Sequence, residues 1–472
     1  MGASTITRGS VQVADKAAAQ EFDILILGGG SGGYAAALRS VELGFSVGLI
    51  EKGKLGGTCL HNGCIPTKAL LHSAEIAENA KTASKYGINA TFDSIDMNAV
   101  NSYKDNIIAG KFRGLQGLIK SKGITVIEGE GKLTSEKTIE VNGETYTGKN
   151  IILATGSYSR SLPGLEIGGK VITSDQALKM DTVPKSAVIL GGGVIGVEFA
   201  SVWNSFGVDV TIVEGLPSLV PNEDAAIIKN LERAYKKRGI KFSTGIFFDN
   251  VKQNDDGVVV TLADGKTFEA DLMLVAVGRG PVTANLGYEE AGITMDRGFV
   301  ITNERLHTGV GNIYAVGDIV PGLQLAHRGF QQGIFVAEEI AGLKPVVVED
   351  VNIPKVTYCE PEIASVGLTE AKAKEKLGAE NVEVQEYNLA GNGKTSILGS
   401  SGLIKMVREK DGPIVGVHMI GGRIGEQIGE AQLIVNWEAY PEDIASLIHA
   451  HPTQNEALGE AAMALAGKPL HG

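Results

Sequence analysis

Short apolar segments alternate with longer segments of helical periodicity along most of the chain. The short segments are rich in Ile, Leu and Val, which is typical of strands in parallel sheets that are covered on both faces. The clearest of them span residues 22–27, 46–50, 151–154, 186–190 and 208–213. Helical segments follow them, so the pattern predicts an α/β fold built from parallel sheets.

A glycine-rich turn, Gly28-Gly29-Gly30-Ser31-Gly32-Gly33, comes directly after the first of these strands. It matches the fingerprint of a dinucleotide-binding turn, in which Gly28 makes the tight turn and Gly30 lets the backbone approach a pyrophosphate. Gly33 allows the helix over residues 34–44 to pack closely on the strand, and the start of that helix favours phosphate. Glu51 ends the second strand, where a carboxylate can accept hydrogen bonds from ribose hydroxyls.

The same arrangement recurs later in the chain. Gly191, Gly193 and Gly196 follow the strand at 186–190, and Glu214 closes the next strand at the spacing that Glu51 has in the first copy. Either motif alone could be an ordinary glycine-rich turn of an α/β protein, but two copies with matching spacing predict two dinucleotide sites. Since no Arg lies near Glu214 to hold a 2′-phosphate, the second site favours NAD over NADP.

Three further apolar segments end in a glycine. They lead to Gly156, Gly278 and the pair Gly317-Asp318. Taken alone, each is better explained as the end of a strand than as a functional site.

Two cysteines, Cys59 and Cys64, follow the first acidic residue by a short, glycine-containing segment. At this spacing they can form a disulfide near a helix start, a position that lowers the pKa of a thiol. They could instead be small buried residues or half of a zinc site, although zinc normally takes four ligands and the remaining thiol, Cys359, is distant in sequence. We expect Cys359 to be an inert packing residue and expect no metal site.

Composition narrows the class of protein. The chain of 472 residues is 43% hydrophobic with a net charge of −12, which suits a globular protein of several domains and argues against nucleic-acid binding. No apolar stretch reaches the length of a membrane span, so we expect no membrane insertion. Three cysteines do not make a disulfide scaffold. Residues 1–20 lack the apolar core of a secretory signal, and we interpret them as a disordered extension of a cytoplasmic protein.

A histidine-rich segment, His449-Ala450-His451-Pro452, lies near the C-terminus, and Glu456 follows it. If the cysteine pair exchanges with a dithiol, a base has to remove a thiol proton, and histidine titrates near neutral pH. On spacing alone, however, a helix start with a surface histidine is the better interpretation, and a metal-binding histidine pair is the weakest one.

The cysteine segment resembles the active-site signature of the flavoprotein disulfide reductases, in Gly56-Gly57-Thr58-Cys59 and Cys64-Ile65-Pro66-Thr67-Lys68. The resemblance extends from about Phe22 to the C-terminus and includes the His451 to Glu456 segment. It implies that the first turn binds FAD and the second binds NAD. It also implies that Cys59 exchanges with substrate and that Cys64 is the thiolate on the flavin side.

The resemblance assigns further residues. Lys68 and Glu198 would pair beside the flavin ring, and His451 would be the base with Glu456 as its partner. Both would act on the cysteines of a second subunit, which implies a homodimer. The remaining cofactor contacts that it implies are Thr58, Gly131, Gly156, Gly278, Asp318 and Ala326.

The implied fold is α/β, with two Rossmann-like dinucleotide-binding domains, the NAD domain inserted in the FAD domain, and a C-terminal α+β dimerisation domain. Expected strands of that last domain are residues 354–358 and 416–420. The expected boundaries are 1–20 for the extension, 21–150 for FAD, 151–278 for NAD, 279–350 for a central segment returning to the FAD domain, and 351–472 for dimerisation.

Within the family, the segment from Cys59 to Leu71 is most similar to the branch that oxidises dihydrolipoyl groups. The chain lacks a lipoyl domain, so the expected partner is an acyltransferase or carrier protein of a 2-oxo acid dehydrogenase or glycine-cleavage system. A glutathione-type reductase, a quinone reductase and a non-catalytic redox sensor are the alternatives. The chain departs from the common family pattern at His61, Asn62, Gln324 and Asn455.

Overall fold

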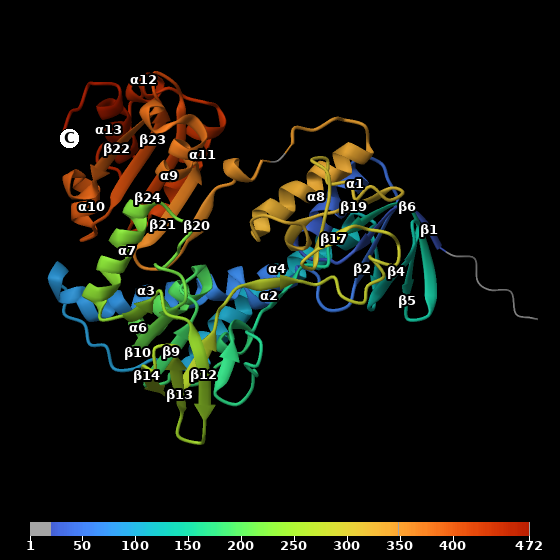
Figure 1. The fold of residues 1–472 in the computed structure, drawn as a ribbon, viewed down its shortest axis with the longest axis horizontal. Helices are drawn as coiled ribbons and strands as arrows, with labels where there is room; N and C mark the ends of the chain where they lie inside the picture. Colours follow the sequence, from blue (N-terminus) through green and yellow to red (C-terminus); the bar gives the residue numbers. More distant parts are fainter. Residues whose placement is uncertain (1–19, 348, 472) are drawn as a thin grey trace, which may run out of the picture.

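The computed structural model describes residues 20–347 and 349–471. The expected N-terminal extension lies outside them, apart from Gln20, which begins the first strand. Figure 1 shows the first sheet in one lobe, while a second parallel sheet and a C-terminal antiparallel sheet lie together in the other. The expected fold class, with two Rossmann-like regions and a C-terminal α+β region, is confirmed.

The first sheet is parallel at its centre. Its strand order is β3-β2-β1-β6-β5-β4, with β19 also paired to β6. Because β19 lies far along the sequence, the chain returns to the first sheet after building the second one. The strands are β1 (Gln20–Leu27), β2 (Val47–Glu51), β3 (Thr125–Glu128), β4 (Gly131–Ser135), β5 (Thr138–Val141), β6 (Glu144–Leu153) and β19 (Ile313–Ala315).

Helices cover this sheet, and α1 (Ser31–Glu42) packs on α8 (Ala326–Ile340). The two helices approach so closely that a Cβ on Gly333 would lie 2.2 Å from the carbonyl oxygen of Gly32. The cysteine segment forms α2 (Gly57–Asn62) and the start of α3 (Cys64–Thr82). The long helix α4 (Met97–Ser121) follows; the side chain of Asp96 caps its first turn by accepting from the amides of Asn98 and Ala99.

The second parallel sheet has the order β11-β10-β9-β15-β8. Two antiparallel crossing strands, β7 (Ser157–Ser159) and β16 (Arg279–Pro281), connect it with the first sheet. A three-stranded antiparallel sheet, β12-β13-β14, flanks it. The elements are β8 (Val171–Thr173), α5 (Ser174–Ala177), β9 (Ser186–Leu190), α6 (Val194–Phe206), β10 (Asp209–Glu214), α7 (Ala225–Arg238), β11 (Lys241–Thr244), β12 (Phe248–Gln253), β13 (Val258–Leu262), β14 (Thr267–Ala270) and β15 (Leu272–Val275).

The C-terminal sheet is antiparallel, with the order β20-β21-β24-β23-β22. Strand β24 contains the strand expected at 416–420, and β20 covers residues 355–357 of the strand expected at 354–358. A short hairpin, β17 (Met295–Asp296) with β18 (Phe299–Val300), precedes it. The elements are β20 (Lys355–Thr357), β21 (Glu362–Gly367), α9 (Glu370–Leu377), β22 (Val382–Asn388), α10 (Gly393–Ile397), β23 (Leu403–Glu409), β24 (Ile414–Gly421), α11 (Ile428–Asn436), α12 (Pro441–Ala445) and α13 (Glu456–Leu465).

Burial explains the apolar runs from which the sheets were expected. Ile24, Leu25 and Ile26 on the central strand β1 are all fully buried, because helices or other layers cover both faces of that strand. Strand β6 continues to Leu153, past the expected boundary at residue 150, since its apolar end belongs to the same sheet. Within the described ranges, no helix is long and apolar enough to cross a membrane.

Candidate active site

The two glycine-rich turns have nearly the same geometry. In the first, the Glu51 carboxylate accepts hydrogen bonds from the amides of Gly29 (2.7 Å) and Gly53 (2.7 Å). In the second, the Glu214 carboxylate accepts from the amides of Gly192 (2.6 Å) and Leu216 (2.7 Å). Each carboxylate is therefore held against its own glycine-rich turn, at the carboxyl end of a parallel strand, where nucleotides bind in such sheets.

The glycines of each turn divide into two kinds. A Cβ on Gly33 would lie 1.8 Å from the Gly28 carbonyl oxygen, and one on Gly196 would lie 1.9 Å from the Gly191 carbonyl oxygen, so packing requires glycine at both. A Cβ on Gly30 would meet only the Gly57 Cα, at 4.0 Å, and Gly193 has no neighbour within 4 Å. Gly30 and Gly193 thus face open space in front of a helix N-terminus, as a pyrophosphate cradle requires.

Residues predicted to contact FAD from the first turn and from β4 lie close together in the fold. One cavity of about 60 Å³ is lined by Gly28, Glu51 and Gly131. These three residues were predicted from distant parts of the sequence. Lys52 and Glu130, which pair at 3.0 Å, lie at the same cavity.

The other predicted FAD contacts lie at the ends of β19 and α8. Asp318 follows β19, and its carboxylate accepts a hydrogen bond of 2.5 Å from the Ser157 hydroxyl. Arg279 donates to the same hydroxyl at 2.7 Å, so both crossing strands are tied to Asp318. Ala326 is the first residue of α8. Ser157 and Arg279 were not singled out from the sequence, where they are ordinary polar residues after a glycine.

Gly156 and Gly278 lie directly before the crossing strands β7 and β16. The Gly156 carbonyl accepts from the amide of Val282, and the Gly278 carbonyl accepts from the amide of Arg160. Both have positive φ angles, 75° and 107°, which glycine adopts readily. They therefore shape the connection between the two nucleotide-binding regions, and a direct contact with either cofactor stays a prediction.

The structure contains the cysteine pair as two free, half-buried thiols. Cys59 lies on α2, with Thr58 beside it, and Cys64 is the first residue of α3. A hydrogen bond from the Cys59 thiol, helped by the Lys68 ammonium, lowers the pKa of Cys64 to about 7, although burial opposes this. The same hydrogen bond raises the pKa of Cys59. Cys64 is therefore the thiol that ionises first near neutral pH.

Lys68 lies one helical turn after Cys64 and forms an ion pair with Glu198 of α6. Its Nζ is 3.0 Å and 2.9 Å from the two carboxylate oxygens. Burial by itself would lower the pKa of Lys68, but the Glu198 carboxylate raises it, so the side chain stays an ammonium. Because α6 begins at the second glycine-rich turn, this pair connects the cysteine helix directly with the second nucleotide-binding region.

Tyr358 also contacts this ion pair, and sequence analysis had placed it only in an expected strand. Its amide donates to the Glu198 carboxylate at 2.9 Å, and its ring lies 4.7 Å from the Lys68 Nζ, within the range of a cation–π interaction. Cys359, the next residue, is 1% exposed, and burial raises its pKa. It is an unreactive packing thiol, as expected.

The C-terminal histidine segment contains two His–Glu pairs. His451 Nδ1 lies 2.8 Å from Glu456 Oε1, and the other oxygen of Glu456 accepts from the amide of Thr453 at 2.8 Å. These bonds lower the pKa of Glu456 against the effect of burial, so it is a carboxylate that orients the imidazole. His449 instead pairs with Glu430 at 2.8 Å and is mostly buried, whereas the His451 side chain is 79% exposed.

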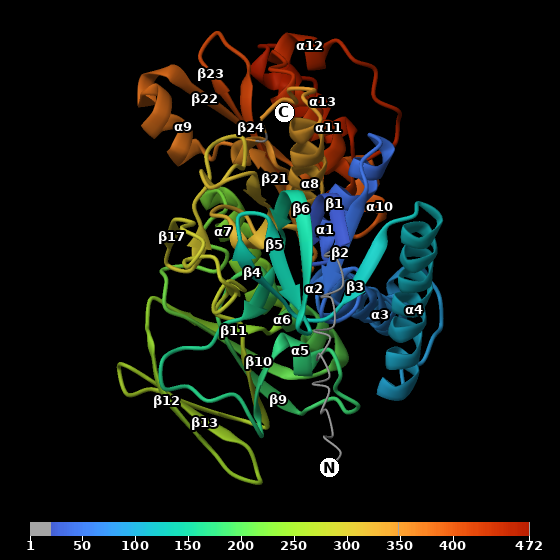
Figure 2. The ribbon, with the colours of Figure 1, turned by 90° about the vertical axis from the view of Figure 1, so that its right-hand side faces the viewer.

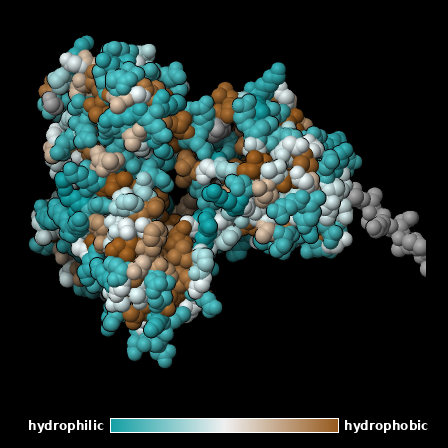
Figure 3. Space-filling model, in the orientation of Figure 1, coloured by the Kyte–Doolittle hydropathy of each residue, from teal (hydrophilic) through white to brown (hydrophobic). Residues whose placement is uncertain are grey.

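The structure does not bring His451 and the cysteines together within one chain. Figure 1 and Figure 2 place α13 in the C-terminal region, well apart from α2. In the part of the chain that the structure describes, His451 makes no hydrogen bond to either cysteine. The surface between the two lobes is indented, with apolar residues along it (Figure 3).

The departures from the common family pattern have identifiable contacts. His61 Nε2 lies 2.9 Å from the carbonyl oxygen of Leu55, and its ring packs edge-on against Phe112. Gln324 donates weakly to the Asp318 carbonyl at 3.4 Å, and Asn455 donates to Glu430 at 2.6 Å. Asn62 is the last residue of α2. None of these contacts displaces a predicted reacting group.

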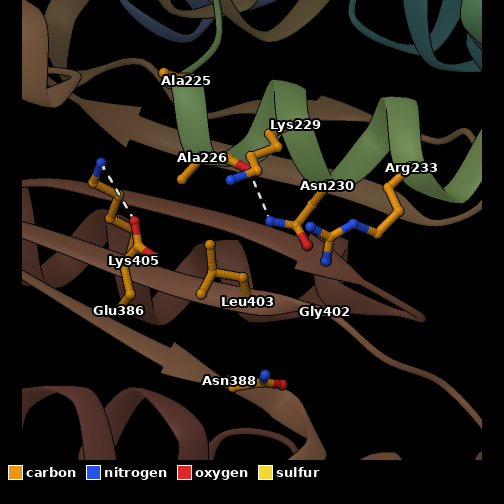
Figure 4. A pocket seen from close by; sticks show the side chains of 10 residues that line it. All are labelled: Ala225, Ala226, Lys229, Asn230, Arg233, Glu386, Asn388, Gly402, Leu403 and Lys405. Carbon is orange, nitrogen blue, oxygen red and sulfur yellow. Dashed lines mark hydrogen bonds and ion pairs between the residues drawn. The ribbon is translucent and has the colours of Figure 1, made fainter.

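A separate cavity of about 460 Å³ lies between α7 and the strands β22 and β23 (Figure 4). It contains none of the residues predicted for the site, so the cavity is not the place of the thiol chemistry. Its lining residues are Ala225, Ala226, Lys229, Asn230, Arg233, Glu386, Asn388, Gly402, Leu403 and Lys405.

Two dinucleotide turns and a dithiol beside a buried ion pair define an oxidoreductase that moves electrons between a disulfide and a nucleotide. Family comparison agrees: residues 22–333 match the pyridine nucleotide-disulphide oxidoreductase family, and residues 353–462 match the dimerisation domain of that family. The chain belongs to the pyridine nucleotide-disulphide oxidoreductases. FAD and NAD are accordingly its cofactors, and its C-terminal region is a dimerisation domain.

Individual relatives are similar over nearly the whole chain. A dihydrolipoyl dehydrogenase of Bacillus subtilis is 42% identical over 96% of this chain and 100% of its own length. A mitochondrial dihydrolipoyl dehydrogenase of Pisum sativum is 41% identical, over 96% of this chain and 93% of its own. Among solved structures, LpdA of Mycobacterium tuberculosis superposes with a TM-score of 0.87 at 25% identity, covering 94% of this chain and 99% of that one.

Proposed function

We propose that the protein oxidises dihydrolipoyl groups carried by other proteins to lipoyl groups, and that NAD is the final electron acceptor. The observation that carries the proposal is the Cys59–Cys64 pair beside the Lys68–Glu198 ion pair, between the two nucleotide turns. The choice of dihydrolipoyl as substrate is supported by the full-length similarity to dihydrolipoyl dehydrogenases and by the acidic Glu214, which suits NAD.

The reaction begins with the cysteines joined in a disulfide. His451, oriented by Glu456, removes a proton from one substrate thiol, and the resulting thiolate attacks the sulfur of Cys59. The Cys59–Cys64 bond breaks and leaves Cys64 as a thiolate, which the nearby Lys68 ammonium stabilises. The second substrate thiol then attacks the mixed disulfide, so that lipoyl leaves and Cys59 takes up a proton through His451.

The substrate has now lost two electrons and the cysteine pair has gained them. FAD held at the first turn would supply the redox group through which this electron pair could reach NAD as a hydride. Gly30 would admit its pyrophosphate, Glu51 would hold its ribose, and Lys68 with Glu198 would lie at its reactive end. Over one cycle, dihydrolipoyl and NAD⁺ give lipoyl, NADH and one proton.

The exposed position of His451, apart from the cysteines of its own chain, supports a site shared between two subunits of a homodimer. We therefore propose that His451 and Glu456 of one subunit serve the cysteine pair of the other. The partner that carries the lipoyl group is proposed to be an acyltransferase or carrier protein in the cytoplasm.

The test is NADH formation by the flavin-loaded protein with dihydrolipoamide and NAD. We expect rapid turnover that is abolished in Cys64→Ser and unchanged in a matched Cys359→Ser variant, because Cys359 is buried away from the exchange chemistry. A parallel reaction with NADPH and glutathione disulfide should show no activity. Absence of lipoamide turnover in flavin-loaded protein would contradict the proposal, and activity in the glutathione reaction would replace it with a different disulfide substrate.

A further inference from the structure

Two large apolar side chains are exposed beside the second nucleotide turn. Phe247 is 67% exposed and Leu216 is 49% exposed. Leu216 follows Glu214 by two residues, and Phe247 lies shortly after β11, the neighbouring parallel strand. Both loops therefore lie at the carboxyl edge of the sheet, which is the edge that holds the glycine-rich turn.

The Phe247 ring lies against the neighbouring loop. A Cβ on Gly215 would lie 2.8 Å from Phe247 Cδ1 and 2.9 Å from Cε1, so the ring lies directly against the backbone of Gly215. The Leu216 carbonyl also accepts a hydrogen bond of 2.7 Å from the amide of Gly245. The loop after β10 and the loop after β11 thus form one unit, with an aromatic ring on its surface.

The order of the strands gives the direction in which a dinucleotide would extend. The pyrophosphate cradle at Gly193 follows β9, and Glu214, which suits ribose hydroxyls, ends β10. The next strand outward is β11, about 4.8 Å further across the sheet. A base attached to a ribose held by Glu214 would consequently lie over the ends of β10 and β11, where Leu216 and Phe247 are exposed.

The first nucleotide region provides an internal comparison. There, Lys52 follows Glu51, and Glu130 lies after the outer strand β3; the two side chains form an ion pair of 3.0 Å. The corresponding loops of the second region present Leu216 and Phe247 instead. The exposed apolar surface is therefore a particular feature of the second site and does not follow from the fold that both sites share.

We propose that Phe247, together with Leu216, forms the platform on which the purine base of NAD stacks, and that Phe247 sets much of the affinity for the dinucleotide. This inference rests on the proposed assignment of the second turn to NAD. A largely exposed aromatic ring that lies against the backbone can stack on a base without ordering a flexible chain. Stacking of this kind typically contributes about 5- to 100-fold in affinity per base.

The test is binding of ADP-ribose, which contains the base, both riboses and the pyrophosphate of NAD but no nicotinamide. Calorimetry with the flavin-loaded protein should show affinity about 5- to 100-fold weaker in Phe247→Ala and near the unsubstituted value in Phe247→Tyr, which keeps the ring. Gly215→Ala should also weaken binding, because its methyl group would displace the ring. Leu343→Ala, which removes a 55% exposed apolar side chain of the other lobe, is the matched control.

In steady-state kinetics, Phe247→Ala should raise the KM for NAD and leave kcat unchanged. Unchanged ADP-ribose affinity in Phe247→Ala, or no ADP-ribose binding by the unsubstituted protein, would overturn the inference. Failure of the proposed function would look different: ADP-ribose would still bind in a Phe247-dependent manner while dihydrolipoamide gave no NADH.

Discussion

At the scale of single residues, the central feature is the unequal ionisation of two neighbouring thiols. The Cys59 thiol donates to Cys64, and the Lys68 ammonium adds to the effect, so the pKa of Cys64 falls to about 7. Since the thiolate is the reactive form of cysteine, this arrangement makes a reactive Cys64 thiolate available near neutral pH. Glu198 limits the effect, because its negative charge opposes a second anion nearby.

Replacement of Lys68 should shift the ionisation of Cys64 to higher pH. Lys68→Met removes a cation that stabilises the thiolate, so the pKa of Cys64 should rise and less thiolate should be present at pH 7. The measurement is the pH dependence of iodoacetamide alkylation in a Cys59→Ser background, where Cys359 is too buried to interfere. Lys355→Met, which disrupts a separate pair with Glu223, is the control. A midpoint that does not move would contradict the proposed role of Lys68.

His451 provides the second prediction at this scale. His451→Gln should lower kcat by about 10²–10⁴-fold, because the dithiol loses its base, while the flavin content stays unchanged. Glu456→Gln should have a smaller effect, since the amide can still contact the ring but does not stabilise its charge. His449→Gln is the comparison within the same segment, as His449 is mostly buried and pairs with Glu430. A larger loss of kcat in His449→Gln than in His451→Gln would show that His451 is not the base.

At the scale of elements, single helices join functions that the sequence shows only as separate motifs. Helix α6 begins at the second nucleotide turn and carries Glu198 in its first turns, and α3 carries both Cys64 and Lys68. The ion pair between Lys68 and Glu198 therefore joins the cysteine helix to the nucleotide helix. If nucleotide binding shifted α6, this ion pair would transmit the shift to Lys68 and so change the pKa of Cys64.

Two glycines at the start of α6 should respond differently to the same substitution. Gly193→Ala should leave the fold and flavin content intact, because its Cβ meets nothing within 4 Å, but it should weaken ADP-ribose binding by occupying the phosphate cradle. Gly196→Ala should lower thermal stability, since its Cβ would lie 1.9 Å from the Gly191 carbonyl oxygen. Thermal unfolding and calorimetry separate the two effects, and equal behaviour of the variants would refute the distinction.

At the scale of the whole molecule, the predicted catalytic groups lie in different regions of one chain. The proposal that a second copy supplies the base rests on the dimerisation domain and on the exposed position of His451. Ion pairs between regions also hold one chain together. The buried Lys405 of β23 pairs with Asp224 at 3.0 Å. Because Asp224 is the N-cap of α7, this pair joins the C-terminal sheet to that helix.

A shared site can be tested with a heterodimer of two inactive variants. One subunit carries Cys64→Ser and the other His451→Gln, each with a different affinity tag for purification after coexpression. If sites form across the interface, one site of each heterodimer contains both substitutions and the other contains neither. The heterodimer should therefore recover about half of the unsubstituted activity. Both parent homodimers should stay inactive, and a heterodimer as inactive as they are would place each site within a single subunit.

The sequence alone was sufficient for the fold class and for most of the local chemistry. Each nucleotide turn depends on glycines and an acid at short spacing, and apolar strands buried on both faces leave a continuous signal in the sequence. The positions of Glu51, Glu214, Cys59, Cys64, Lys68 and His451 followed from such patterns, together with the family resemblance. Local spacing was informative because each group belongs to a short motif: each acid is bonded to its own nucleotide turn, Cys64 and Lys68 lie on one helix, and His451 pairs with Glu456.

Which residues remote in sequence come into contact depends on how the sheets and helices pack. Tyr358 reaches Glu198 because the C-terminal sheet packs near α6, and Ser157 with Arg279 reaches Asp318 because two crossing strands pair between the lobes. Phe247 appears in the sequence as one more apolar residue, and its exposure is visible only once β11 lies beside β10. Contacts between segments remote in sequence depend on how sheets and helices pack, and no local pattern of residue types encodes that packing.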